Sequence, residues 1–187
     1  MVVWGDNSYG ESTAPAGLSN VVAIAAGSVH SLALKSNGTV VGWGYDFWGQ
    51  VTPPRGLSNV IAIAAGTDHS LALKSDGTVV GWGGDSLRQA TPPAGLANVV
   101  AIAAGGADSL AIVAQPSLQA QSDGTNRNLV VHWPLWADGF SLEMTENLPG
   151  TSSWVPVGVV PVVVNSQYTL TNPFSATSRF YRLRKGF

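Results

Sequence analysis

Residues 30–44 read HSLALKSNGTVVGWG, and residues 69–83 read HSLALKSDGTVVGWG. The two stretches start at His30 and His69 and differ only at Asn37 and Asp76. The preceding segment also recurs, since GLSNVVAIAAG at 17–27 returns as GLSNVIAIAAG at 56–66 and as GLANVVAIAAG at 95–105. Self-similarity at a fixed period of roughly 40 residues is typical of folds that stack one supersecondary unit per repeat.

Each repeat contains short segments with the pattern of β-strands. In the second repeat these are Val60–Ala65, Ser70–Lys74 and Val79–Trp82, and an Asp-Gly turn joins the last two. Asp-Gly and Asn-Gly favour positive φ and are strong hairpin signals. A fourth short strand is expected near Gln50-Val51 and Gln89-Ala90, before paired prolines end the pairing. About four short strands per repeat describe one blade of a β-propeller.

The composition supports an all-β chain and excludes several classes of function. Charged residues are 11% of the chain, while 22 glycines and 11 prolines suit short strands joined by tight turns. The net charge is −2 and no basic run occurs, which argues against a nucleic-acid partner. Apolar runs such as Val21–Ala26 and Val155–Val164 are too short to span a bilayer. There is no cysteine and no spacing of metal ligands, so we expect no metal and no cofactor.

The stretch from Ile24 to Gln50 follows the pattern I-A-A-G-x-x-H-S-L-A-L-K-x-D-G-x-V-x-x-W-G-x-N-x-x-G-Q almost residue for residue. In this it resembles the regulator-of-chromosome-condensation repeat family. The spelling is most similar to bacterial members, including the propeller-type β-lactamase inhibitor proteins. The resemblance covers residues 1 to about 114 and implies propeller blades. It implies no single function, because members of the family include nucleotide-exchange factors, enzyme inhibitors and scaffolds.

The third repeat is incomplete, because it runs from Ser109–Val113 directly into Gln115-Pro116 and has no VVGWG strand. Val2–Gly5 is an isolated copy of that strand, and we expect the chain to start inside a longer reading frame. Relatives close with six or seven blades, whereas this chain has three. We therefore expect a homodimer in which two chains join head to tail into a six-bladed ring, each Val2–Gly5 completing the other chain's last blade. The alternative is a fragment whose remaining blades are absent.

The composition changes after Ala114, and we divide the chain into blades (1–114), a linker (115–118) and a β-sandwich (119–187). Trp133, Phe140, Trp154 and Tyr181 occupy core-like alternate positions. The module resembles the fibronectin-type-III-like C-terminal modules of exported bacterial proteins, which implies an extracellular or cell-surface location. Its expected strands are Leu129–Trp133, Phe140–Thr145, Trp154–Val159, Gln167–Leu170 and Arg179–Leu183.

Two residue types recur at fixed positions and are expected to be structural. His30 and His69 directly precede a strand and are expected to bond the backbone of the neighbouring blade. Asp108 is the polar substitute in the third repeat. The other recurring type is tryptophan, expected to wedge between adjacent blades: Trp4, Trp43 and Trp82.

The repeats disagree in the loop after Trp-Gly and in the two residues before the histidine. Such variation within a fixed frame is how repeat proteins present a binding surface, here at one rim of the propeller. Aromatic anchors with a polar fringe suit a protein partner or a glycan. The same rings can instead fill the space between loops or the seam of the dimer. The candidate rim residues are Tyr9, Tyr45, Asp46, Phe47, Trp48, Asp68, Asp85 and Arg88.

An enzymatic alternative uses the carboxylates of the rim. Asp46 and Asp85 are repeat equivalents, and two carboxylates at a suitable separation can serve as general acid and base in a glycoside hydrolase acting on β-linked sugars. Aspartate is nevertheless ordinary in surface turns. We therefore favour a binding protein without catalysis.

Overall fold

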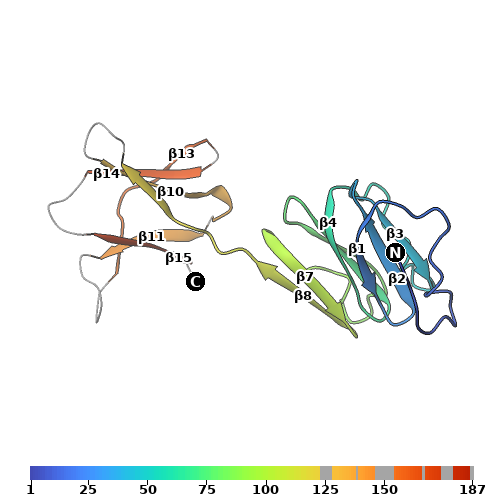
Figure 1. Cartoon of the computed structure of the whole chain (residues 1–187). Helices are drawn as coiled ribbons and strands as arrows, with labels where there is room; N and C mark the ends of the chain where they lie inside the picture. Colours follow the sequence, from blue (N-terminus) through green and yellow to red (C-terminus); the bar gives the residue numbers. More distant parts are fainter. Residues whose placement is uncertain (123–127, 138, 146–153, 166, 174–178, 186–187) are drawn as a thin grey trace. The chain divides into compact units, whose positions relative to one another are not determined.

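The computed structural model describes residues 1–122, 128–137, 139–145, 154–165, 167–173 and 179–185 (Figure 1). In these ranges the protein is all-β, as predicted, and the only helix is the one-turn η1 (Leu135–Ala137). The chain divides into two compact units, Met1–Ala114 and Gln115–Phe187.

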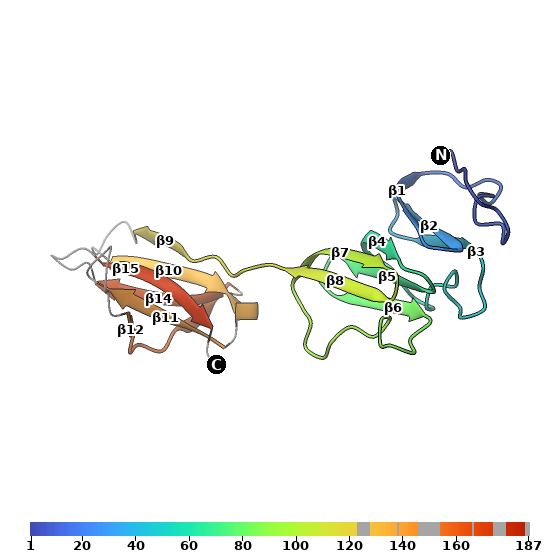
Figure 2. The ribbon, with the colours of Figure 1, turned by 90° about the horizontal axis from the view of Figure 1, so that it is seen from below.

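The first unit, here called the propeller unit, is a row of small antiparallel sheets (Figures 1 and 2). The strand β4 of the middle sheet contacts β1 and β2 on one side and β7 on the other. We number the sheets as blades 1 to 3. Blade 1 contains β1 (Val21–Ala26), β2 (His30–Lys35) and β3 (Val40–Gly44); blade 2 contains β4 (Val60–Ala65), β5 (His69–Lys74) and β6 (Val79–Gly83); blade 3 contains β7 (Val99–Gly105) and β8 (Asp108–Val113).

The turn between the second and third strand shows why the repeat has Asn-Gly or Asp-Gly followed by threonine. Asp76 Oδ1 accepts hydrogen bonds from the backbone N–H of Thr78 at 3.0 Å and from its hydroxyl at 2.6 Å. Asn37 binds Thr39 in the same way. The intervening Gly38 and Gly77 both have φ of 78°, a conformation that favours glycine. The predicted hairpins are therefore present in blades 1 and 2.

The core of the propeller unit lies between blades 1 and 2. Leu32 and Leu34 of β2 are buried, and they pack with Val60 of β4 and Trp82 of β6. Alternate alanines of β1, Ala23 and Ala25, contact the same cluster. Each blade thus buries its second strand against the first strand of the next blade.

The predicted fourth strand is wrong. Residues 50–51 and 89–90 form turns, because their polar backbone groups are already used by the loop and by the following blade. The carbonyl of Gln50, for example, accepts hydrogen bonds from Ser70 Oγ and Trp82 Nε1. The turn also presses on the blade before it, since a Cβ added to Gly42 would collide with the carbonyl of Val51.

Blade 3 has two strands, and the N-terminal segment does not pair with it in the single chain. Val2–Gly5 forms no strand, and the side chains of Val2 and Trp4 are 76% and 80% exposed. Val3 stands at the position that Gly42 and Gly81 occupy in blades 1 and 2.

The second unit contains two sheets around a shared core. Their strand orders are β13-β14-β10-β9 and β12-β11-β15. The buried core consists of Val131, Trp133, Ala137, Leu142 and Leu170. The strands are β9 (Gln119–Ser122), β10 (Asn128–Pro134), β11 (Phe140–Thr145), β12 (Val155–Pro156), β13 (Val162–Val164), β14 (Gln167–Pro173) and β15 (Phe180–Lys185).

Four of the five strands expected here lie in β10, β11, β14 and β15, whereas the segment Trp154–Val159 shortens to the two residues of β12. β9 and β13 were not predicted. Glu143 is buried and pairs with Arg182 at 2.7 Å and Arg184 at 3.3 Å. The hydrogen bond from Arg182 is the main cause of the lowered pKa of Glu143. The likeness to fibronectin type III stays a prediction.

Candidate functional site

The three loops at residues 6–13, 45–52 and 84–91 share one hydrogen-bonded frame. Asn7 Oδ1 accepts the backbone N–H of Ser12 at 2.9 Å. Asp46 and Asp85 accept the N–H of Val51 and Ala90 in the same way, at 2.9 and 2.8 Å. Each of these three side chains also bonds a threonine hydroxyl: Thr13, Thr52 and Thr91.

A second contact fixes the tip of each loop. The side chains of Glu11, Gln50 and Gln89 accept the backbone N–H two residues before them, at 2.8 to 2.9 Å. The residues whose N–H is held in this way are Tyr9, Trp48 and Leu87, whose side chains are 54%, 56% and 71% exposed. At this position each loop therefore holds a large apolar side chain outward on a fixed backbone.

Leu87 belongs to this set, but it was not among the candidate rim residues. The signal that identifies it is register, because Tyr9, Trp48 and Leu87 occupy the same position in successive repeats. Leu87 is not aromatic, so only this equivalence of position identifies it.

Four of the predicted rim residues form a continuous contact, here called the aromatic row: Tyr9, Tyr45, Phe47 and Trp48. The ring centroids of Tyr9 and Tyr45 are 4.8 Å apart, and those of Phe47 and Trp48 are 4.9 Å apart. Tyr45 and Phe47 stack at 6.2 Å with an interplanar angle of 13°. The row thus joins two successive loops into one exposed surface.

Asp68 lies at one end of this row. A Cβ built on Gly84 would lie 3.2 Å from Asp68 Cβ and 3.6 Å from Trp48 Cγ, so both residues approach the same backbone. The Asp68 carbonyl accepts the N–H of Gly84 at 2.7 Å. The structure therefore brings Asp68 next to Trp48.

The remaining candidates, Asp85 and Arg88, lie in the third loop. The pKa of Asp85 is lowered, first by the hydrogen bond from Thr91 and then by that from Ala90. A general acid needs a raised pKa, and Asp85 has the opposite shift. Asp46 binds Val51 and Thr52 through its two carboxylate oxygens. Asn7 makes the equivalent hydrogen bonds in the first loop without a charge, so the side chain at this position closes the loop. The geometry therefore gives no support to the glycoside hydrolase alternative.

The repeated histidines connect blades. His30 Nε2 lies 3.0 Å from Ser70 Oγ, and His69 Nε2 lies 2.9 Å from Ser109 Oγ. The next blade also contributes backbone hydrogen bonds, between Thr67 and His30 and between Asp108 and His69, as expected, and the serine hydroxyls were not predicted. Burial lowers the pKa of both histidines, so their neutral forms are favoured.

The tryptophans do not all behave alike. Trp43 and Trp82 are 8% and 7% exposed, and their Nε1 atoms donate to the carbonyls of Glu11 and Gln50 at 2.8 and 2.9 Å. Trp4 was expected to wedge in the same way, but its side chain is 80% exposed.

Within the described ranges, no three His, Cys, Asp or Glu residues are grouped to hold a metal ion. No described helix has the length and apolar character needed to cross a membrane.

Comparison with known proteins agrees with the blade geometry. The ectodomain of the receptor kinase CR4 from Physcomitrella patens matches with 30% identity and a TM-score of 0.50, over 59% of this chain and 32% of that protein. Prp20p from Saccharomyces cerevisiae, described with its binding to Gsp1p and histones, matches with 19% identity and a TM-score of 0.51, over 82% and 44%. This chain therefore spans less than half of either protein. Because its identity is so low, the likeness to Prp20p concerns the fold alone. No curated protein sequence matches the chain significantly.

The sequence profile of the Regulator of chromosome condensation (RCC1) repeat matches residues 21–50 and 60–89. Each matched segment begins at the first strand of a blade and ends at Gln50 or Gln89, the residue whose carbonyl receives the next blade. Residues 21–50 and 60–89 are therefore two Regulator of chromosome condensation (RCC1) repeats, folded as neighbouring blades.

Proposed function

We propose that the chain is a binding protein without catalytic activity and that it contacts a protein ligand through the aromatic row. The observation that carries this proposal is the continuous contact from Tyr9 through Tyr45 and Phe47 to Trp48, most of it exposed to solvent. Aromatic side chains grouped in this way, with a polar fringe, are typical of the energetic centre of protein interfaces.

The rigidity of the loops supports the same proposal. Each loop is closed by its own Asp or Asn and by its own Glu or Gln, so the rings are held before any ligand arrives. A preorganised surface loses less conformational entropy on binding. The carboxylates of Asp46 and Asp68 provide a negative fringe, which favours a partner with basic residues around an apolar centre.

A glycan is the second candidate ligand. Tyr45 and Phe47 are nearly parallel, and the ring of Phe47 is 70% exposed, which provides a flat platform of the kind on which the face of a sugar can stack. A protein ligand and a glycan ligand can be distinguished by testing the chain against a peptide array and a glycan array.

The test compares the wild-type chain with the double variant Phe47→Ala/Trp48→Ala and with the control Ile61→Ala. Ile61 is 57% exposed but lies on β4, outside the loops. Peptides selected from a displayed random library on the wild-type chain should bind the control equally and lose binding to the double variant. Equal binding to all three proteins contradicts the proposal. Glycan binding with the same dependence, in place of peptide binding, changes the ligand class.

An extracellular or cell-surface location, implied by the resemblance of the sequence, stays a prediction. Pairing with a second copy also belongs to this proposal, because β1 and β8 carry exposed apolar side chains such as Ile24 and Leu110.

A further inference from the structure

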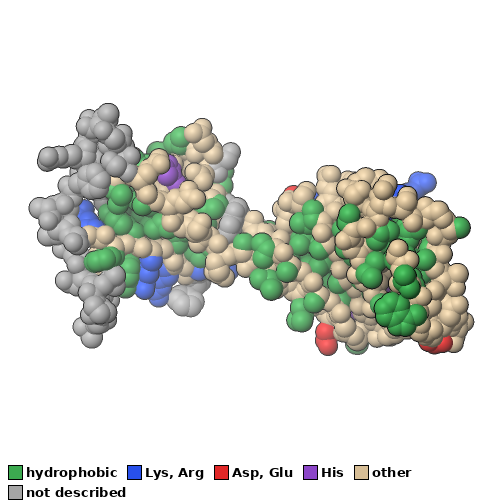
Figure 3. Space-filling model, viewed as in Figure 1, with side chains coloured by type: hydrophobic (Ala, Val, Ile, Leu, Met, Phe, Trp, Pro, Cys, Tyr) green, Lys and Arg blue, Asp and Glu red, His purple; other side chains and the backbone are tan. Residues whose placement is uncertain are grey.

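The contact between successive blades follows one pattern, which stops at blade 3. Leu32 and Leu71 occupy the same position in β2 and β5, and they are 0% and 3% exposed. The equivalent Leu110 in β8 is 67% exposed, and Ile112 two residues later is 63% exposed. Blade 3 therefore exposes the side chains at positions that blades 1 and 2 bury. Figure 3 shows hydrophobic side chains over the part of the propeller unit that carries β7 and β8.

The opposite end of the row has the complementary deficit. Ile63 of β4 is partly buried against blade 1, whereas its equivalent Ile24 of β1 is 63% exposed. Val60 and Val99 are 4% and 3% exposed, while Val21 is only half-buried. The two ends of one chain thus carry the two halves of the contact that joins its own blades.

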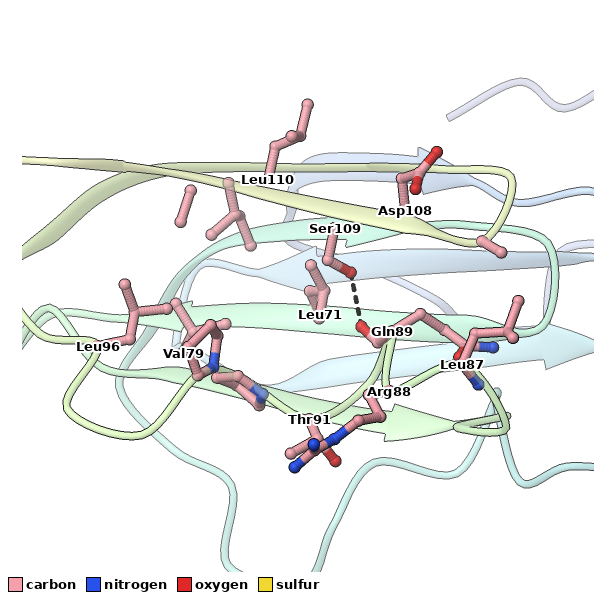
Figure 4. Close-up of a pocket in the computed structure, with 15 residues that line it drawn as sticks. Leu71, Val79, Leu87, Arg88, Gln89, Thr91, Leu96, Asp108, Ser109 and Leu110 are labelled. Atoms are coloured by element: carbon pink, nitrogen blue, oxygen red, sulfur yellow. Dashed lines mark hydrogen bonds between the residues drawn. The ribbon is translucent and has the colours of Figure 1, made fainter.

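A cavity of about 420 Å³ marks the missing strand of blade 3 (Figure 4). Its lining includes Leu71, Val79, Leu96, Ile102 and Ala111. These residues are the equivalents, one repeat later, of members of the core between blades 1 and 2: Leu32, Val40, Leu57, Ile63 and Ala72. That core also contains Trp82, whose equivalent is absent here because residue 121 is Gln121. The cavity therefore corresponds to the space that the Trp82 side chain fills in the core between blades 1 and 2.

The hydrogen bonds to the loop carbonyls differ in the same way between blade 3 and the other two blades. The carbonyls of Glu11 and Gln50 each accept a serine hydroxyl and an indole N–H. The carbonyl of Gln89 accepts Ser109 Oγ at 2.6 Å, drawn in Figure 4, and within the described residues it accepts no indole. One indole donor is needed to complete the pattern.

We propose that this donor is Trp4 of a second copy of the chain. Residues Met1–Gly5 of one copy add to β8 of the other as its third strand, with the Trp4 indole donating to the Gln89 carbonyl and filling the cavity beside Leu71. The β1 strand that follows then covers Leu110 and Ile112 with Ile24. This occupant is favoured over other partners because both surfaces continue the interface that already joins blades 1 to 3.

The contact is head to tail, and two such contacts close a ring of two copies. It uses strands β1 and β8 and the N-terminal segment, none of which belongs to the aromatic row. Failure of this inference is therefore distinguishable from failure of the proposed ligand surface.

The first test is the mass of the native chain in solution across a concentration series. Two copies give twice the 19.3 kDa of one chain. The exchanges Ile24→Asp and Leu110→Asp should each weaken self-association by about tenfold or more, because a buried carboxylate would then face apolar side chains. Ile61→Asp is the matched control, since Ile61 is similarly exposed but belongs to the middle blade. Unchanged circular dichroism spectra show that the variants still fold.

The second test locates the contact. In blades 1 and 2, Ala33 pairs with Val41 and Ala72 pairs with Val80, so Ala111 should lie opposite Val2 of the other copy. The chain has no cysteine, and the single variants Val2→Cys and Ala111→Cys, mixed and oxidised, should therefore form a disulfide between the two different chains. A monomer at every concentration, an open-ended polymer, or no enrichment of this mixed disulfide would overturn the proposal.

Discussion

His30 of blade 1 and Ser70 of blade 2 are joined across the blade boundary by a hydrogen bond of 3.0 Å between Nε2 and Oγ. Ser70 Oγ donates its own proton to the carbonyl of Gln50, so Nε2 of His30 is the donor in the neutral ring. The same pair recurs as His69 and Ser109. Neutral histidine is therefore part of the contact between blades.

This pairing predicts a loss of stability on mild acidification. The folded state lowers the pKa of both histidines below the ordinary 6.5, chiefly by burial. The unfolded chain consequently binds more protons just below pH 6.5, and the free energy of unfolding falls as the pH decreases through that region. Urea denaturation between pH 7.5 and 5 measures the slope. The double variant His30→Gln/His69→Gln should have a smaller slope there, and an equal slope would contradict the assignment.

The indole of Trp82 should contribute to stability through its N–H as well as its ring. Trp82→Phe leaves the carbonyl of Gln50 with one donor and opens space in the core, so we expect a cost of roughly 1–3 kcal/mol. Chemical denaturation measures it. Trp48→Phe is the control: its side chain is more than half exposed, and no appreciable cost is expected there.

The carboxylate of Asp46 should be replaceable by an amide. Asn7 closes the first loop with the same acceptor geometry, so Asp46→Asn should keep stability within about 0.5 kcal/mol. Asp46→Ala removes the acceptor for Val51 N–H and should cost about 1 kcal/mol. Thermal unfolding of the pair separates hydrogen bonding from charge. A large loss with asparagine would show that the charge itself is needed.

Arg88 adopts the backbone conformation that its equivalents achieve with glycine. Its φ is 64°, whereas Gly10 and Gly49 have φ of 83° and 80°. The left-handed region costs a residue with a Cβ about 1–2 kcal/mol, partly offset by the greater entropy of unfolded glycine. Arg88→Gly should therefore raise the free energy of unfolding by up to about 1 kcal/mol. Urea denaturation measures this free energy. A lower free energy of unfolding for Arg88→Gly would mean that the arginine side chain makes a stabilising contact.

Asp108 occupies the position of His30 and His69 at the uncovered end of blade 3. In the proposed pair of chains it faces Ser31, whose hydroxyl already donates to the carbonyl of Glu11 and so needs a donor opposite. Asp108→His supplies that donor and should tighten self-association by about tenfold, the worth of one hydrogen bond of about 1.4 kcal/mol. Sedimentation analysis measures the change. Asp108→Asn, whose shorter side chain does not reproduce the imidazole, should have less effect.

The repeated parts of the fold were predictable because a pattern that recurs in three copies identifies the same strands and turns in each copy. The strands of blades 1 and 2 follow the sequence closely, and four of the candidate rim residues, Tyr9, Tyr45, Phe47 and Trp48, are in contact. The fourth strand was predicted wrongly. The residues at Gln50-Val51 do not reveal that side chains of the next blade donate hydrogen bonds to the Gln50 carbonyl. The edge strands β12 and β13 of the second unit have two and three residues, too few for alternation to reveal them.

The carbonyl of Gln50 precedes blade 2 in sequence, yet it is bonded by two side chains of that blade. A blade is thus completed by the loop on its N-terminal side. For protein engineering, the cassette to duplicate runs from residue 45 to residue 83, loop first and Trp-Gly strand last. A cassette that began at β4 instead would leave the first blade of the array without the loop carbonyl that its indole needs.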